Sequence, residues 1–254
     1  MSEVGLVSPG EMGTAVGAAL VAGGHVVRFA SDGRSEETSA RAAAAGFEDV
    51  RSFAQLASGC EVLLSVCPPQ FALDTARAFT GFGGIYVDAN AIAPATAAEV
   101  AGSVENYVDG GIIGPPPLEP GSTRLYLSGG AAAAQLAELF AGSALDARVI
   151  GEAPTAASAL KMAYAAWTKG SAALLLTAHE AAQRLGVAGE LEAEWELSQP
   201  RLAERLAGAE RSRAAKGWRW TPEMREIAAT FEAVGLPGGF HEAAAEVFDP
   251  EDRV

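Results

Sequence analysis

In the first 150 residues, short apolar segments alternate with segments of helical character, and this alternation restricts the possible folds more than any other feature. Parallel strands need a crossover of about a dozen residues or more, usually a helix, whereas antiparallel strands can be joined by a tight turn. The pattern therefore predicts an α/β fold with a parallel sheet over residues 1–150. The expected strands are Val4–Val7, His25–Ala30, Val62–Val66, Ile85–Val87, Asn106–Val108, Arg124–Leu127 and Arg148–Ile150.

After Gly151 the alternation stops. From Thr155 to Leu185 alanine and leucine dominate, and Gly170 is the strongest helix breaker in the stretch. A helix of this length would extend roughly 46 Å, which is too long for a crossover within a sheet. We therefore expect a second, all-helical domain over residues 151–254, joined to the first by this long helix. Its further helices are expected at Leu191–Leu206, Pro222–Ala233 and Phe240–Val247, with breaks at Gly217 and at residues 236–239.

Composition excludes several classes of partner. With 18 basic and 32 acidic residues the net charge is −14, which argues against binding to nucleic acid or to an anionic membrane. The two cysteines and three histidines form no pattern typical of a disulfide framework or of a metal site. The N-terminus has no basic and apolar segment typical of a signal peptide. We expect a cytoplasmic protein that acts on a small molecule, and a homodimer, because the faces of the long apolar helix need covering.

The turn after the first strand has the form of a phosphate-binding loop. A G-x-G-x-x-G turn between a strand and a helix lets the backbone approach a pyrophosphate, whose charge lies at the helix N-terminus. This chain has serine in place of the first glycine, and we expect the turn to bind a dinucleotide through Ser8, Pro9, Gly10, Glu11, Met12 and Gly13. An alternative is a capping box formed by Ser8 and Glu11, with Pro9 at the first helical position. Capping alone does not account for Gly10 and Gly13, each of which costs about 1 kcal/mol relative to alanine within a helix.

The end of the second strand indicates which dinucleotide binds. NAD-binding proteins place an acidic residue there for the ribose hydroxyl, whereas this chain has Ser31, followed by Arg34 and Ser35. Arginine donates paired hydrogen bonds to phosphate, so these residues favour the 2′-phosphate of NADP. Asp32 could instead take the acidic role of NAD-binding proteins, and the segment could also be a simple polar turn. We expect NADP, with NAD as the alternative.

Several motifs together resemble a known family. They are the turn of residues 8–13 with His25 after its helix, Ser65-Val-Cys-Pro-Pro69, Val87-Asp-Ala-Asn-Ala-Ile-Ala-Pro-Ala-Thr96, Asp109-Gly-Gly-Ile-Ile-Gly114, and Gly151 followed by Lys161. In this order they resemble the β-hydroxyacid dehydrogenase superfamily, especially its 6-phosphogluconate dehydrogenase-like NADP-binding branch. The tail from Gly235 to His241 is similar to a less characterised subgroup. The resemblance implies a Rossmann-type domain over residues 1–150 and a helical substrate-binding and dimerisation domain over residues 151–254.

The resemblance also implies roles for individual residues. Lys161 matches the general acid/base lysine of relatives, and a lysine in an apolar cleft can exchange a proton near neutral pH. Tyr164 and Thr168 share its helix face and could contact the substrate or orient the amine. The alternative is that Lys161 lies at the surface and that Tyr164 and Trp167 pack in the core. Residues expected to line the cofactor or substrate are Cys67, Pro68, Asn90, Ile113, Gly114, Glu223 and His241.

Departures from the family pattern affect the expected substrate. Relatives have Asp-x-Ser-Thr where this chain has Asp88-Ala-Asn90-Ala91, and a Ser-Gly-Gly loop where it has Ile113-Gly114-Pro115. Asn90 retains polar groups for recognition or catalysis. We therefore predict an NADP-dependent oxidoreductase that reduces a carbonyl, of the hydroxy acid/keto acid type or a bulkier analogue. The alternatives are an imine reductase and a non-catalytic NADP-binding redox sensor.

Overall fold

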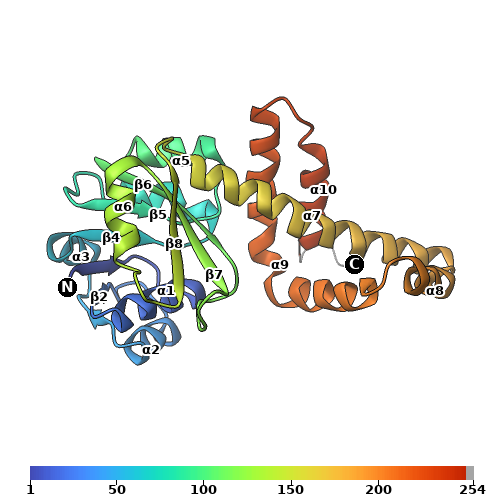
Figure 1. Cartoon of the computed structure of the whole chain (residues 1–254), viewed down its shortest axis with the longest axis horizontal. Helices are drawn as coiled ribbons and strands as arrows, with labels where there is room; N and C mark the ends of the chain where they lie inside the picture. The colour runs from blue at the N-terminus through green and yellow to red at the C-terminus, as the bar shows by residue number, and fades with distance from the viewer. Residues whose placement is uncertain (250–254) are drawn as a thin grey trace. The chain divides into compact units, whose positions relative to one another are not determined.

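The computed structural model of the chain describes residues 1–249. They form two compact units, Met1–Lys161 and a unit that begins at Met162. The element that passes from one unit into the next is the long helix α7, Ala156–Leu185 (Figure 1). Within the described part of the chain, no helix is both long enough and apolar enough to cross a membrane.

The first unit is built on an eight-stranded sheet with the strand order β3-β2-β1-β4-β5-β6-β7-β8. Neighbouring strands described here are parallel except β6 and β7, which are antiparallel and joined by the short segment 114–122. The predicted α/β class is thus confirmed, with one antiparallel pair in a sheet expected to be parallel. The strands are β1 Glu3–Leu6, β2 Val26–Phe29, β3 Glu48–Asp49, β4 Val62–Ser65, β5 Ile85–Asp88, β6 Asn106–Ile113, β7 Thr123–Ser128 and β8 Leu145–Gly151.

Helices cover both faces of this sheet and close two apolar cores. One core packs strand residues such as Leu6, Leu64 and Leu127 against α1, α2 and α6. The other packs Leu63 and Tyr86 against α3, α4 and α5. Side chains alternate between the two faces along a strand. Ser65 on β4, Asp88 on β5 and Asp109 on β6 therefore lie on the same face as Leu63 and Tyr86. The helices are α1 Glu11–Ala22, α2 Glu36–Ala44, α3 Phe53–Gly59, the short 3₁₀ helix η1 Pro69–Phe71, α4 Ala72–Arg77, α5 Pro94–Ala101 and α6 Gly130–Glu138.

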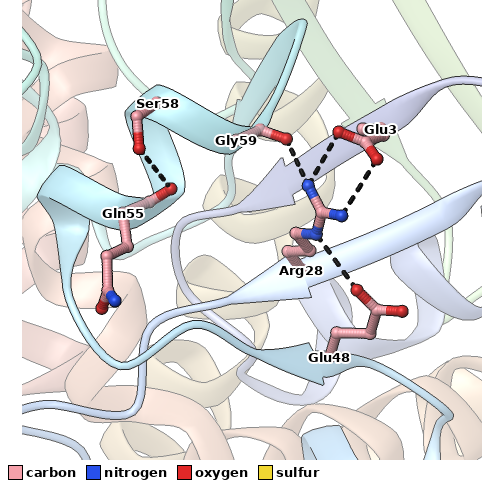
Figure 2. A network of polar contacts seen from close by, with 6 residues as sticks. All are labelled: Glu3, Arg28, Glu48, Gln55, Ser58 and Gly59. Carbon is pink, nitrogen blue, oxygen red and sulfur yellow. Dashed lines mark hydrogen bonds and ion pairs between the residues drawn. The ribbon is translucent and has the colours of Figure 1, made fainter.

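A polar network joins β1, β2 and β3 near the first residue of β1, at the end of the strand away from the turn of residues 8–13. Arg28 on β2 donates to both carboxylate oxygens of Glu3 at 2.7 and 2.9 Å, and to Glu48 on β3 at 3.1 Å. It also donates to the carbonyl of Gly59 at the end of α3, where a cation interacts favourably with the helix dipole (Figure 2). Hydrogen bonding to Glu3 raises the pKa of Arg28. This network is partly exposed, and it ties the edge of the sheet together.

The second unit consists of helices. The predicted long helix is confirmed by α7, and the others are α8 Ala188–Ser198, α9 Leu202–Ala233 and α10 Gly239–Phe248. Figure 1 shows α10 lying beside α9. In their contact, Trp220 packs edge-to-face on Phe248 with ring centroids 4.9 Å apart.

Two expectations for this unit are wrong. The predicted helix Leu191–Leu206 is interrupted after Ser198, and the next helix runs without a break through Gly217 and Pro222. Gly217 is a packing residue, because a Cβ there would lie 2.8 Å from the carbonyl oxygen of Phe248 on α10. Pro222 lies inside α9 instead of starting a separate helix, although a proline has no N–H to donate within the helix.

Candidate active site

The candidate site begins at the turn between β1 and α1. Helix α1 begins at Glu11, and its N-cap is Gly10, which has no side chain to accept from the first N–H groups. The alternative of a capping box formed by Ser8 and Glu11 is therefore wrong. Ser8 contributes its carbonyl oxygen, which accepts from the Gly10 N–H at 2.9 Å and makes a tight turn ahead of the helix. No side chain caps the N-terminus of α1, and the backbone N–H groups of a helix N-terminus favour an anion.

The two glycines of the turn have different surroundings. A Cβ at Gly13 would lie 2.3 Å from the Ser8 carbonyl oxygen, so the turn can close over α1 only with glycine there. A Cβ at Gly10 would meet no protein atom within 4 Å. Gly10 adopts an extended conformation open to any residue, with φ −72°. The fold itself thus requires glycine at position 13 but not at position 10, which leaves room beside Gly10 for another molecule.

Arginine side chains from the second strand–helix unit lie against this turn. Arg34 donates to the carbonyl oxygen of Val7 at 2.8 Å and lies over the Phe53 ring, 5.7 Å from its centroid. Partial burial lowers the pKa of Arg34 from its ordinary value. Arg41 on α2 donates to the carbonyl of Pro9 at 3.4 Å. A guanidinium predicted to bind phosphate is thus next to the turn, and a second one lies nearby.

Asp32, the acidic residue that could favour NAD, follows the end of β2. Asp32 lies 3.8 Å from the guanidinium of Arg51 and is exposed. The Ser31 N–H donates to Asp49 at 3.2 Å. Burial raises the pKa of Asp49, but hydrogen bonds from Ser31 and Arg51 outweigh this effect and lower the pKa overall. Ser35 is the N-cap of α2 and accepts from the Thr38 N–H at 3.2 Å. The hydroxyl of Ser35 therefore has a capping partner, while Asp32 faces a cation.

The strand ends of β4 and β5 are joined by Asn90. Its side chain accepts from the Cys67 N–H at 2.5 Å and donates to Ser65 at 3.1 Å and to Asp88 at 2.8 Å. Asn90 is 2% exposed, and each hydrogen-bonding group of its amide has a protein partner. Its observed contacts fix the loop of Cys67 and Pro68, and the predicted contacts with cofactor or substrate stay a prediction. Burial raises the pKa of the Cys67 thiol to about 11, so the thiol is protonated at neutral pH.

Four polar residues form a buried row across the sheet. Ser65, Asp88, Asp109 and Ser128 are cross-strand partners on β4, β5, β6 and β7, and each is at most 1% exposed. Burial raises the pKa of Asp88 to about 7, with a further increase from the neighbouring Asp109 and an opposing effect of hydrogen bonds from Asn90. Burial also raises the pKa of Asp109, against hydrogen bonds from Ser158 and Ser128.

Lys161 lies next to this row. It belongs to α7, whose first turn packs on β6 at Gly111, two residues beyond Asp109 and on the same face of the sheet. A Cβ at Gly111 would lie 2.8 Å from the Ala157 carbonyl oxygen and 3.1 Å from the Lys161 Cβ. Asp109 pairs with the last residue of β5, and Gly111 lies two residues further along β6. Lys161, which packs on Gly111, therefore lies at the carboxyl ends of the parallel strands, where the loops that follow β1 and β4 also lie.

Strand β6 ends at the predicted substrate loop. Ile113 is its last residue and is 4% exposed, and Gly114 has φ +132°, which favours glycine. A Cβ at Gly114 would lie 2.5 Å from the Ser122 carbonyl oxygen. The structure thus explains Gly114 by backbone geometry, and substrate contacts of these residues stay a prediction.

The other predicted residues lie in the second unit. Tyr164 is 45% exposed, and its carbonyl accepts from the Thr168 hydroxyl at 3.2 Å. Glu223 is buried and forms an ion pair with Lys169, whose amine lies 5.3 Å from the Trp220 centroid. Substrate contacts of these residues stay predictions.

His241 is also buried in the second unit. Its ring makes edge-to-face contacts with those of Phe231 and Phe240, at centroid distances of 4.5 and 5.4 Å. Its Nδ1 has no hydrogen-bond partner among the described residues, and burial lowers its pKa. His241 is therefore a neutral imidazole at pH 7, and its contact with substrate stays a prediction.

Sequence reasoning missed Arg41, Ser158 and the role of Asp109. Asp109 carried a signal, because a carboxylate directly after a buried strand valine needs partners. Ser158 carried none, since a serine in the first turn of a helix is common. Among residues 1–249, no group of three or more metal-ligating side chains lies close enough to hold an ion.

Comparison with known proteins supports the resemblance of the sequence motifs. Residues 182–250 match a domain of unknown function, DUF1932. An uncharacterized 28.5 kDa protein in the 7S RNA 5′ region of Methanothermus fervidus is 32% identical over 163 residues. That match covers 63% of this chain and 62% of the relative, so it spans less than two thirds of the relative's length.

Solved structures show the fold. The conserved protein MTH1747, of unknown function and with structural similarity to 3-hydroxyacid dehydrogenases, is 29% identical with a TM-score of 0.72, over 97% of this chain and 95% of its own. The chain has the hydroxyacid dehydrogenase fold. Mycobacterium tuberculosis 3-hydroxyisobutyrate dehydrogenase, solved with L-serine, matches this fold with a TM-score of 0.72 at 18% identity, covering 98% and 92% of the two chains. A reductive aminase from Aspergillus terreus, in complex with NADPH and ethyl levulinate, matches it with a TM-score of 0.62 at 16% identity, covering 98% and 92%.

Proposed function

We propose that the protein is an NADP-dependent oxidoreductase that reduces a carbonyl group, with Lys161 as the general acid. The observation that carries the proposal is that Lys161 and the glycine turn of residues 8–13 both lie at the carboxyl ends of the parallel strands. The turn has open space at Gly10. In folds of this kind, ligands bind outside the carboxyl ends of the strands, where the strand order reverses. Here the reversal falls between β1 and β4. The hydroxyacid dehydrogenase fold and its neighbours, which are dehydrogenases and reductases, support the same function.

The residues of the first turn fit a dinucleotide. We assign the pyrophosphate to the N-terminus of α1 and to the main chain of residues 8–13, because Gly10 leaves space there. Arg34, with Ser31 and Ser35, would hold a 2′-phosphate, since Arg34 lies beside the turn and Asp32 faces Arg51. The loop of Cys67 and Pro68, fixed by Asn90, would border the nicotinamide end. When bound, the nicotinamide would supply the hydride.

The protein's own residues would supply the proton and orient the substrate. Lys161 would donate a proton to the carbonyl oxygen as negative charge develops on it. We assign Tyr164 to a catalytic role beside it and keep Asn90 as a polar group of the site. Substrate contacts are proposed for Ile113, Gly114, Thr168, Glu223 and His241. Residues 1–150 would then be the dinucleotide-binding domain and residues 151–254 the substrate and dimerisation domain.

A homodimer is part of the proposal. In the second unit, large apolar side chains of α7 are exposed: Trp167 is 71% exposed, Leu174 58% and Leu185 77%. They recur along one long helix, and side chains of this kind are enriched in the cores of homodimer interfaces. A second copy of the chain would cover them.

Imine reduction is the second candidate. It is favoured by the match to the reductive aminase solved with NADPH. It is also favoured by the apolar Ile113-Gly114-Pro115 segment, which offers no hydroxyl for a substrate carboxylate. A charged ammonium donor at Lys161 suits an alkoxide better than an imine nitrogen, so we place carbonyl reduction first. A redox sensor that only binds NADP would have no need of Lys161.

The direct test is a titration of the protein with NADPH and, separately, with NADH, followed by calorimetry and thermal melting. We expect micromolar binding of NADPH and weaker binding of NADH. A ligand at a hundred times its Kd should stabilise the fold by about 2.7 kcal/mol. Gly10→Ala is the matched variant: its stability should change by less than about 1 kcal/mol, while its NADPH affinity falls at least tenfold. Wild-type protein that binds neither cofactor would contradict the proposal.

A further inference from the structure

We infer that Asp109 is a positioning residue for Lys161, acting through the first turn of α7. The inference rests on the proposed function for its consequence in catalysis, but the anchor itself is a feature of the fold. Asp109 is completely buried on β6, and it binds α7 at Ser158, three residues before Lys161.

The Asp109 carboxylate accepts from donors on both sides. One oxygen, Oδ2, accepts from the Ser158 N–H at 2.8 Å and from the Ser128 hydroxyl at 3.1 Å. The other, Oδ1, accepts from the Ser158 hydroxyl at 2.5 Å and from the Tyr107 hydroxyl at 3.4 Å. All of these partners donate to the carboxylate, and an ionised carboxylate is the acceptor-only group that matches them.

This carboxylate joins the start of α7 to the sheet. The N–H of Ser158 belongs to the first turn of α7, where backbone donors have no partner within the helix. The N–H of Ala157 donates to Ser128 at 3.1 Å, and Ser128 in turn donates to Asp109. A carboxylate at this end also complements the positive end of the helix dipole. Two successive N–H groups of the helix are thus held by side chains of β6 and β7.

The anchor fixes the position of Lys161 because a helix is a stiff element. Lys161 follows Ser158 by three residues, about 4.5 Å along the axis. Gly111 allows the same turn to pack directly on β6, with the Lys161 Cβ against its backbone. The first turn of α7 is thus held to β6 at two points. Hydrogen bonds hold it at Asp109, and close packing holds it two residues further along the strand, at Gly111. Movement of either contact would move the amine away from the strand ends.

Asp109→Asn is the variant that separates the positioning of Lys161 from the binding of NADPH. It keeps the shape of the side chain but places an NH₂ group against donors, so one side of the anchor loses its acceptor. We expect at least a tenfold lower kcat for NADPH-dependent carbonyl reduction and less than a twofold change in NADPH affinity. Ser158→Ala, which removes one hydroxyl and keeps the helix N–H, should lower kcat less and serves where the first variant folds poorly.

The control for acting through Lys161 is the double variant. In a Lys161→Ala background, Asp109→Asn should lower the remaining kcat by less than twofold, because the group that it positions is gone. A matched control for stability is Leu136→Ala, in α6 on the opposite face of the sheet; it should lower the melting temperature without changing kcat. Equal losses of kcat from Asp109→Asn in both backgrounds would overturn the inference.

Hydrogen exchange tests the anchor without any turnover. Amides of residues 157–161 should exchange at least tenfold faster in Asp109→Asn than in wild type, whereas those of residues 173–182 in the same helix should be unchanged. Unchanged exchange at residues 157–161 would overturn the inference. If wild-type protein oxidises no NADPH with a panel of aldehydes, ketones and cyclic imines, the proposed function fails, and this exchange result alone decides whether Asp109 fixes the helix.

Discussion

Two polar networks in the same sheet differ in burial. The network of Glu3, Arg28 and Glu48 lies at the open edge of the first three strands, and its carboxylate side chains are 47% and 59% exposed (Figure 2). The row of Ser65, Asp88, Asp109 and Ser128 crosses the middle of the sheet and is buried. Exposed ion pairs contribute little to stability because water screens them. Buried carboxylates lower stability unless each oxygen has hydrogen-bond partners.

The difference indicates what each network is for. Arg28 links a strand edge to α3, a contact that apolar packing around Leu56 and Leu63 also secures. The buried row ends on one side at the loop of Cys67 and on the other at the first turn of α7. It therefore joins the two segments that would hold cofactor and proton donor. Changes in the exposed network should be mild, and changes in the buried row should alter activity or the dependence of stability on pH.

The largest effect is expected where α7 meets β6. In Gly111→Ala, the new Cβ would meet the Ala157 carbonyl oxygen at 2.8 Å, so the first turn of α7 must move off the strand. We expect a loss of about 1–3 kcal/mol in unfolding free energy, as for overpacked cores, and a fall in kcat of at least tenfold. Urea denaturation and steady-state kinetics measure both. Wild-type kcat in this variant would break the link between the row and catalysis.

Asp88→Asn should change how stability depends on pH. Burial raises the pKa of Asp88 to about 7 in the folded protein, against about 3.9 in the unfolded chain. Between these values the folded state keeps a proton that the unfolded state has lost, so rising pH destabilises the wild type. The asparagine variant lacks this dependence. Its deficit relative to wild type should therefore shrink from pH 4 to pH 7, by at most about 1.4 kcal/mol per unit.

Urea denaturation at a series of pH values measures this difference. Above about pH 8 both states of Asp88 are ionised, and the difference between the two proteins should level off. A difference that grows between pH 4 and pH 7 would mean that Asp88 is stabilised as a carboxylate in the folded protein.

The smallest effect is expected in the exposed network. Glu3→Gln removes the charge that faces Arg28 and keeps the shape of the side chain. We expect a change of less than about 1 kcal/mol in unfolding free energy, reduced further by salt, and no change in kcat. A melting curve and one activity assay suffice. A loss as large as that of Gly111→Ala would mean that the exposed network stabilises the fold as much as the buried contacts do.

Much of the fold could be predicted because its signals are local. Apolar runs between turns predicted each described strand except the two-residue β3, although β6 and β8 are longer than expected, and the uninterrupted stretch to Leu185 predicted α7. The failures were tertiary: Gly217 looks like a helix break until Phe248 of α10 is seen against it. The capping box failed for a related reason, since Ser8 uses its carbonyl to close the turn and leaves the cap to Gly10.

The site was partly predictable for the same reason. The sequence singled out Gly10, Gly13 and Arg34 because each departs from what a plain helix or turn needs. The structure places Arg34 beside the turn, and contacts of these residues with a cofactor stay a prediction. The contacts of Asp109 with Ser158 join residues 49 positions apart, and no periodic pattern connects them. Such a contact becomes visible only when strand register and helix packing are known.

The central claim is that Lys161 supplies the proton in an NADP-dependent reduction. The most direct measurement is single-turnover oxidation of bound NADPH by wild type and by Lys161→Ala, with the NADPH affinity of both proteins determined alongside. We predict equal affinity within about twofold and a reduction rate at least about a hundredfold lower in the variant, the usual scale for loss of a general acid. Equal rates in the two proteins would remove Lys161 from the mechanism and contradict the claim.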